Sequence, residues 1–102
     1  MTIITDDPAA RRARARRLAT RLETDCLAQG GRPDLLLHAA RNRFAAGEPD
    51  LARAQAEALL AWADEDPSYM PGWLAQQARD LLVQIDRGED AGPPAGPVAP
   101  PR

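Results

Sequence analysis

The segment GGRPDLLLHAARNRFAAGEPD, residues 30–50, contains the signals that divide this chain into helices. Gly30–Gly31 can end one helix, because glycine readily adopts the left-handed conformation that follows a helical C-terminus. Pro33 fits the first turn of the next helix, where its missing N–H costs nothing. A glycine followed by a proline occurs again at Gly47 and Pro49. We therefore expect one helix between Pro33 and Gly47.

Equivalent signals mark the two ends of the helical region. Asp7 is placed to cap a helix that begins at Pro8, and Gly88 is placed to end the last one. Apolar residues recur at three- and four-residue spacing, and no segment alternates as a strand would. We therefore predict an all-α fold, a small four-helix arrangement of antiparallel helical hairpins. The predicted helices cover about 8–29, 33–46, 49–64 and 71–87.

The predicted core is thin, because much of the 44% apolar content is alanine and aromatic residues make up only 4%. Small domains with few large side chains are marginally stable, so burial against a partner would add stability. Helical spacing assigns one inner face to each helix. These faces are Ala15, Leu18, Ala19, Leu22 and Cys26; Leu36, Leu37, Ala40 and Phe44; Leu51, Ala54, Ala58, Leu59 and Trp62; and Leu74, Ala78, Leu81, Leu82 and Ile85.

The length of 102 residues corresponds to one domain. We divide the chain into an N-terminal tail (1–7), a helical domain (8–87) and a Pro/Gly-rich tail (88–102) that we predict to be disordered. No apolar run approaches the roughly 18 residues that a membrane span needs, and the N-terminus lacks the features of a signal peptide. We expect a cytoplasmic protein that does not bind membranes.

Charge is unevenly distributed along the chain, whose net charge is −2. Residues 1–22 carry +4 and residues 23–102 carry −6. All thirteen Lys and Arg positions are arginine, which indicates a GC-rich, bacterial-like coding bias more than a demand for guanidinium groups.

The basic stretch RRARARR, residues 11–17, begins the first helix, on which Arg14, Arg17 and Arg21 share one stripe. The stripe is compatible with a solvated face, with pairing to the acids at 64–66, or with binding an acidic protein. A fourth interpretation is contact with nucleic-acid phosphates. The segment has no aromatic residue to stack on bases and no Asn or Gln to read a base edge, so nucleic acid is the alternative and not the first choice.

Two prolines show a spacing typical of a known repeat. Pro33 and Pro67 are 34 residues apart, which is the period of the tetratricopeptide repeat. The segment DPSYMPGW, residues 66–73, resembles the junction between two such repeats, with Trp73 following the proline by six residues.

The preceding segment AAGEPDLARAQAEAL, residues 45–59, is similar to the family's glycine turn and alanine-rich second helix. Gly47, Ala54 and Ala58 would be the small residues that allow paired helices to approach. The resemblance covers at most residues 33–85, about one and a half units. It implies helical hairpins that bind a peptide or a protein and carry out no catalysis.

No pattern predicts catalysis, a cofactor or a metal. His38 and Cys26 are the only residues of their types, so one chain cannot supply a closed zinc site. We expect His38 on a polar helix face, within reach of Asp34, and Cys26 as a small buried hydrophobe. Ser68, the only serine, lies in a proline-bounded turn. We therefore predict that the protein is not an enzyme and has no cofactor.

A group of four large side chains occupies residues 62–73 of this alanine-rich chain. It has two interpretations: it closes one end of the bundle, or it is an interface hot spot, where tryptophan and tyrosine are enriched. The candidate partner-binding residues are Trp62, Tyr69, Met70, Trp73, Arg14, Arg17 and Arg21.

The function that we predict is a non-enzymatic protein–protein interaction module, namely an adaptor, an assembly factor or a minor subunit of a larger complex. Its partner would be another protein, with an acidic protein or a second copy of the chain among the candidates. The alternative is a small nucleic-acid-associated regulator that uses the basic first helix.

Overall fold

The computed structural model describes residues 7–66, 68 and 70–88. Its four helices are α1 (Pro8–Ala28), α2 (Pro33–Ala45), α3 (Pro49–Glu65) and α4 (Gly72–Asp86). The described residues contain no strand, so the prediction of an all-α fold is confirmed. Every predicted helix is present, with its ends displaced by at most one residue. The two predicted tails lie almost entirely outside the described residues.

The helix ends form where the proline and glycine signals place them. The Asp7 side chain accepts a hydrogen bond from the backbone N–H of Ala9 (3.3 Å), which caps the first turn of α1. At the other end, Gly30 and Gly31 have φ values of +75° and +92°. This left-handed backbone lets the Gly31 N–H return to the Cys26 carbonyl oxygen (2.8 Å) and close the last turn.

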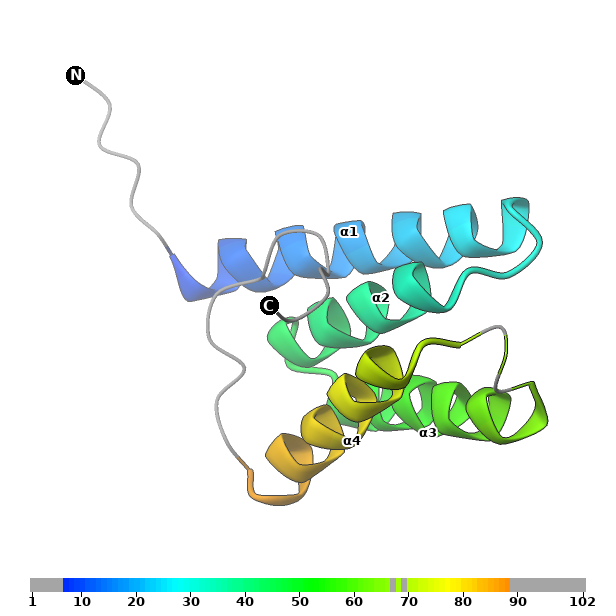
Figure 1. Cartoon of the computed structure of the whole chain (residues 1–102). Helices are drawn as coiled ribbons and strands as arrows, with labels where there is room; N and C mark the ends of the chain where they lie inside the picture. The colour runs from blue at the N-terminus through cyan, green and yellow to red at the C-terminus, as the bar shows by residue number, and fades with distance from the viewer. Residues whose placement is uncertain (1–6, 67, 69, 89–102) are drawn as a thin grey trace.

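The helices form an open stack. Figure 1 shows the chain turning back at each of its three connections. The middle helix α2 packs against α1, α3 and α4, and α3 also packs against α4. Among the described residues the backbone of α1 packs only on α2. The first and last helices therefore do not meet as they would in a closed four-helix bundle, and one long side of α1 is uncovered.

The core is built from two clusters joined by α2, and large side chains are few. Within the described part of the chain, three apolar side chains larger than alanine are fully buried, namely Leu37, Leu59 and Leu74. The first cluster contains Leu37, Leu59, Met70, Leu74, Ala75 and Ala78. The second cluster contains Ala40, Ala52, Ala56, Leu81 and Ile85. The buried residues of α1 are Ala15, Ala19, Leu22 and Cys26.

The predicted inner face of α3 is correct for Leu59, which is buried, and for Trp62, which packs against the core, and it is wrong for the other three residues. Leu51 is 49% exposed, and Ala54 and Ala58 are also exposed. The buried residues of α3 are Ala52, Ala56 and Leu59. Alanine occurs on nearly every side of this helix, so its hydrophobic periodicity does not identify the face that meets α2 and α4.

Two further predictions about helix faces are wrong. His38 is buried, with 8% of its surface exposed, because α2 is covered by three other helices. Asp34, which we expected within reach of His38, receives two hydrogen bonds from Arg32, at 3.2 and 2.6 Å. Leu18, which we expected in the core, is 37% exposed. Cys26 is buried as predicted, and its sulfur accepts a hydrogen bond from the Arg32 N–H (3.2 Å).

None of the helices in the described residues has both the length and the hydropathy needed to cross a membrane.

Two leucine substitutions on α3 test which face is buried. Leu59→Ala removes a side chain with no exposed surface and should lower the free energy of unfolding by about 2–5 kcal/mol. Leu51→Ala should change it by about 0.5 kcal/mol or less, because half of that side chain is exposed. Urea unfolding followed by circular dichroism measures both. Similar decreases in the free energy of unfolding for the two variants would contradict the observation that Leu59 is buried and Leu51 is exposed.

Candidate functional site

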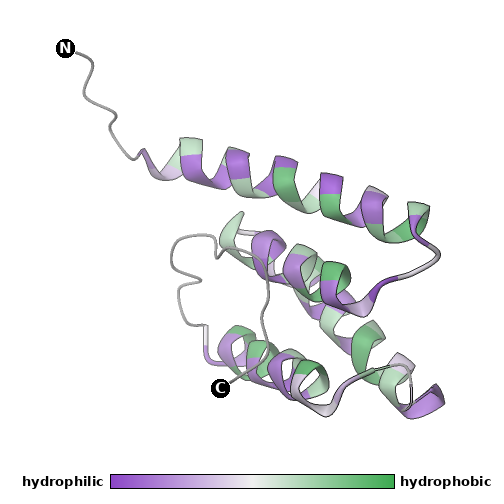
Figure 2. Cartoon of the chain, turned by 45° about the horizontal axis from the view of Figure 1, so that its top comes forward, coloured by the Kyte–Doolittle hydropathy of each residue, from purple (hydrophilic) through white to green (hydrophobic). Residues whose placement is uncertain are grey.

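The uncovered side of α1 carries three exposed arginines, Arg14, Arg17 and Arg21. We call these residues the arginine face. It lies opposite Ala15, Ala19, Leu22 and Cys26, the residues of α1 that are buried where this helix packs on α2. Arg17 and Arg21 make no hydrogen bond or ion pair with any described residue. Figure 2 shows hydrophilic residues recurring along the whole length of α1.

The remaining arginines near the start of α1 are oriented toward the rest of the chain. Arg16 Nε lies 3.6 Å from Glu48 Oε2, and the Arg12 side chain lies beside Gly47. Pairing of this helix with the acids at 64–66 does not occur among the described residues. The basic stretch is therefore divided between the side of α1 that lies near Gly47 and Glu48 and the arginine face.

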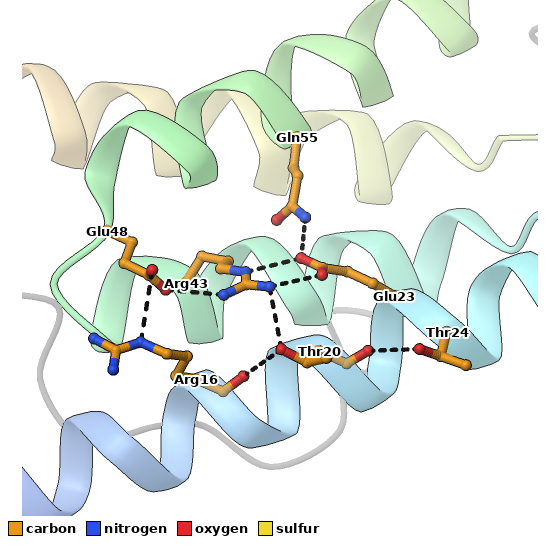
Figure 3. Close-up of polar contacts among 7 residues, drawn as sticks. All are labelled: Arg16, Thr20, Glu23, Thr24, Arg43, Glu48 and Gln55. Carbon is orange, nitrogen blue, oxygen red and sulfur yellow. Dashed lines mark hydrogen bonds and ion pairs between the residues drawn. The ribbon is translucent and has the colours of Figure 1, made fainter.

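A polar network fixes α1 against the next two helices (Figure 3). Arg43 of α2 donates two hydrogen bonds to the carboxylate of Glu23 on α1, at 2.9 and 2.7 Å. Its third nitrogen donates to Glu48 Oε1 in the connection between α2 and α3 (2.9 Å). Gln55 of α3 donates to the same Glu23 carboxylate. The network therefore links α1 to α3, whose backbones do not pack against each other.

Thr20 extends this network along α1. Its hydroxyl accepts a hydrogen bond from Arg43 Nη2 (3.3 Å) and donates one to the Arg16 carbonyl oxygen (3.0 Å). The exposed fractions of the Arg43 and Glu23 side chains are 12% and 28%. The pair is therefore protected from solvent more than a surface ion pair is, and its two parallel hydrogen bonds impose a direction as well as an attraction.

The network shifts the protonation equilibria of both partners. The hydrogen bonds from Arg43 lower the pKa of Glu23 below its ordinary value of 4.5, while partial burial opposes this shift. The bond from Gln55 and the charge of Arg43 lower the Glu23 pKa further. The hydrogen bond to Glu23 raises the pKa of Arg43. Both groups are thus held in their charged forms at neutral pH.

The sequence did not reveal this network. Glu23, Arg43 and Gln55 are separated by 20 and 12 residues along the chain, and no motif joins them. Only the packing of three helices brings their side chains together. A charged residue next to an inner face, such as Glu23 beside Leu22, is the one signal that could have indicated a partly buried ion pair.

The aromatic candidates lie at the end of the stack where α3 leads into α4. Met70 is 4% exposed and belongs to the first core cluster. Trp62 and Trp73 are partly buried and pack against that cluster, and Trp62 also lies beside Gly31 in the α1–α2 connection. Tyr69 lies outside the described residues. The described members of this group thus help to close the end of the fold.

Among the described residues, no group of three or more His, Cys, Asp and Glu side chains is arranged to hold a metal ion.

Replacing Glu23 by glutamine tests the network through its pH dependence. Because the pKa of Glu23 is lowered in the fold, its stabilising contribution is present above pH 4.5 and is lost as the pH falls through the folded-state pKa. The native chain should therefore be more stable than Glu23→Gln at neutral pH, and this difference should shrink in acid. Urea unfolding at neutral and acidic pH measures it.

The control for this experiment is Glu65→Gln, which alters an exposed carboxylate of α3 that has no partner among the described residues. It should show little pH-dependent change in stability relative to the native chain. A Glu23→Gln deficit of the same size at both pH values would mean that charge pairing with Arg43 is not its cause.

No protein-family model matches the chain, and neither a curated protein nor a solved structure matches it. The arginine face combines exposed charge with a fixed position in the fold.

Proposed function

We propose that this protein is a non-enzymatic protein–protein interaction module, acting as an adaptor, an assembly factor or a minor subunit of a larger complex. The observation that carries the proposal is the arginine face, which α1 presents on its uncovered side. Its partner is another protein with an acidic surface. Trp62 and Trp73 supply a second, aromatic contact surface at the end of the stack.

The arginine face is suited to recognising carboxylates. A guanidinium group is planar, stays charged at all physiological pH values and can form two parallel hydrogen bonds to one carboxylate. Arg17 and Arg21 are four residues apart and therefore lie one above the other on the helix. Complementary charge accelerates encounter with an acidic partner and orients it on arrival.

The position of the arginine face is set before binding. The Arg43–Glu23 pair and the Gln55 hydrogen bond hold α1 against α2 and α3. A partner therefore does not have to order this helix, which lowers the entropic cost of association.

We also propose that α2, α3 and α4 form one and a half tetratricopeptide-like units. The supporting observation is the order of packing, in which the α2–α3 hairpin is followed by α4, and α4 packs on both earlier helices. This is what a repeating hairpin with a 34-residue period produces. Gln77 departs from the pattern, since a small residue is expected there. The resemblance independently implies binding of a peptide or protein.

Nucleic-acid binding is the alternative, because exposed arginines also neutralise phosphates. Two observations favour a protein partner. The first and last residues of the arginine face are seven positions apart, or about 10 Å along the helix, which reaches only a few phosphates. The exposed sides of α3 and α4 carry Glu57, Asp64, Glu65 and Asp80, which would repel a polyanion. We place the protein in the cytoplasm, where its single, unpaired cysteine fits a reducing environment.

Affinity purification of the tagged chain from its own cells, at moderate salt and after nuclease treatment, tests the proposal. We expect one specific protein to be retained by the native chain. Substituting Arg14, Arg17 and Arg21 by Ala should reduce its recovery about tenfold or more, as expected for losing close charge pairs. The matched control is Arg41→Ala with Arg79→Ala, which removes exposed arginines of α2 and α4 and should retain the partner.

Other outcomes have distinct meanings. Unchanged recovery with the triple variant would exclude the arginine face as the binding surface. Salt-sensitive retention on duplex DNA or RNA, lost in the same variant, would favour the nucleic-acid alternative. Trp73→Ala tests the aromatic surface, and its unfolding must be measured in parallel because Trp73 packs on the core.

A further inference from the structure

The outer side of α3 is an uncovered helix face with its own pattern. Leu51, Ala54, Ala58 and Ala61 are exposed along it, and Leu51 has 49% of its surface accessible. Acids flank this strip at seven-residue intervals, at Asp50, Glu57 and Asp64. Seven residues are about two helical turns, so the three carboxylates line up on one side of the helix. We call Asp50, Leu51, Ala54, Glu57, Ala58, Ala61 and Asp64 the acidic face.

The charge on this face is not neutralised within the described part of the chain. Glu57 and Asp64 form no ion pair there, whereas Arg53 on another side of α3 pairs with Asp86 of α4 (2.6 Å). Arg17 and Arg21 of the arginine face are equally without partners among the described residues. Arg17 and Arg21 on α1, and Glu57 and Asp64 on α3, thus lack counter-charges within the described part of the chain.

We infer that the acidic face of α3 binds the arginine face of α1 from a second copy of this chain. The inference rests on the proposed function and gives the arginine face a second acidic partner, namely another copy of this chain. Arg17 and Arg21 lie one helical turn apart, and Glu57 and Asp64 lie two turns apart. Two helices lying side by side therefore bring two exposed arginines next to two exposed carboxylates.

The apolar residues of the two faces also suit each other. Ala54, Ala58 and Ala61 leave little side-chain volume on α3, so the axis of a second helix can approach closely. Leu18 beside the arginine face and Leu51 within the acidic face are both partly exposed, at 37% and 49%, and pairing buries them. In this interface complementary charges select the partner face, and burial of the two leucines adds a modest amount to the binding free energy.

The fold determines the symmetry of this association. Within one chain α2 lies between α1 and α3, so the two faces cannot contact each other (Figure 1). The two faces are different surfaces, and each copy that uses one still offers the other. Such head-to-tail contacts build a ring if the rotation between copies closes and an open chain of copies if it does not.

Sedimentation velocity of the full chain over a range of concentrations measures the association. We expect the average mass to rise with protein concentration at low salt and to return toward the monomer at high salt, since salt screens the charge pairs. A monomer at every concentration and salt level would overturn the inference.

A charge exchange identifies the interface. Arg17→Glu with Arg21→Glu reverses the arginine face, and Glu57→Arg with Asp64→Arg reverses the acidic face. Each double variant alone should associate about tenfold more weakly or worse, because like charges then oppose each other. An equal mixture of the two variants should associate again, and so should a chain carrying all four substitutions.

Two unfolded variants would not associate when mixed. Restored association in the mixture therefore cannot be produced by a variant that fails to fold. The charge-matched control is Arg41→Glu with Arg79→Glu on other exposed positions, which should associate as the native chain does. Failure of the mixture to associate would overturn the inference. The proposed function would survive that failure if the purification experiment still retains a different protein through Arg14, Arg17 and Arg21.

Discussion

The hydrogen-bonded pair between Arg43 and Glu23 determines which side of α1 faces outward. Packing alone specifies this weakly, because two of the four buried residues of α1 are alanine and alanine also occurs on its other sides. A two-pronged guanidinium–carboxylate contact does not tolerate rotation of the helix, since a turn of one residue moves Glu23 by about 100°. The orientation of Arg14, Arg17 and Arg21 therefore depends on a residue of the neighbouring helix.

The limits of each helix follow from local chemistry and could be predicted. Proline at Pro8, Pro33 and Pro49, and glycine after α1, α2 and α4, act on the residues next to them, so sequence alone places these boundaries to within one residue. The inner face of α4 was also predictable, because leucine and isoleucine occupy one side of it in preference to others.

The buried side of α3 and the burial of His38 could not be predicted, because both depend on tertiary packing. Alanine carries too little hydrophobic contrast to distinguish Ala54 and Ala58 from the buried Ala52 and Ala56. His38 is buried because α2 is the central helix. The spacing of apolar residues along each helix does not indicate which helix packs in the centre. The same applies to the polar network, whose members come from three helices.

The open stack also has a consequence for how the chain acquires its structure. Apart from the contact between α2 and α4, each helix packs on the next one in the sequence, across connections of only a few residues. Such short-range topology keeps the loop-closure entropy of the folding nucleus small and belongs to the class of proteins that fold in microseconds to milliseconds. Helices can then dock in the order of their synthesis, and α1 can settle on α2 before the C-terminal half has left the ribosome.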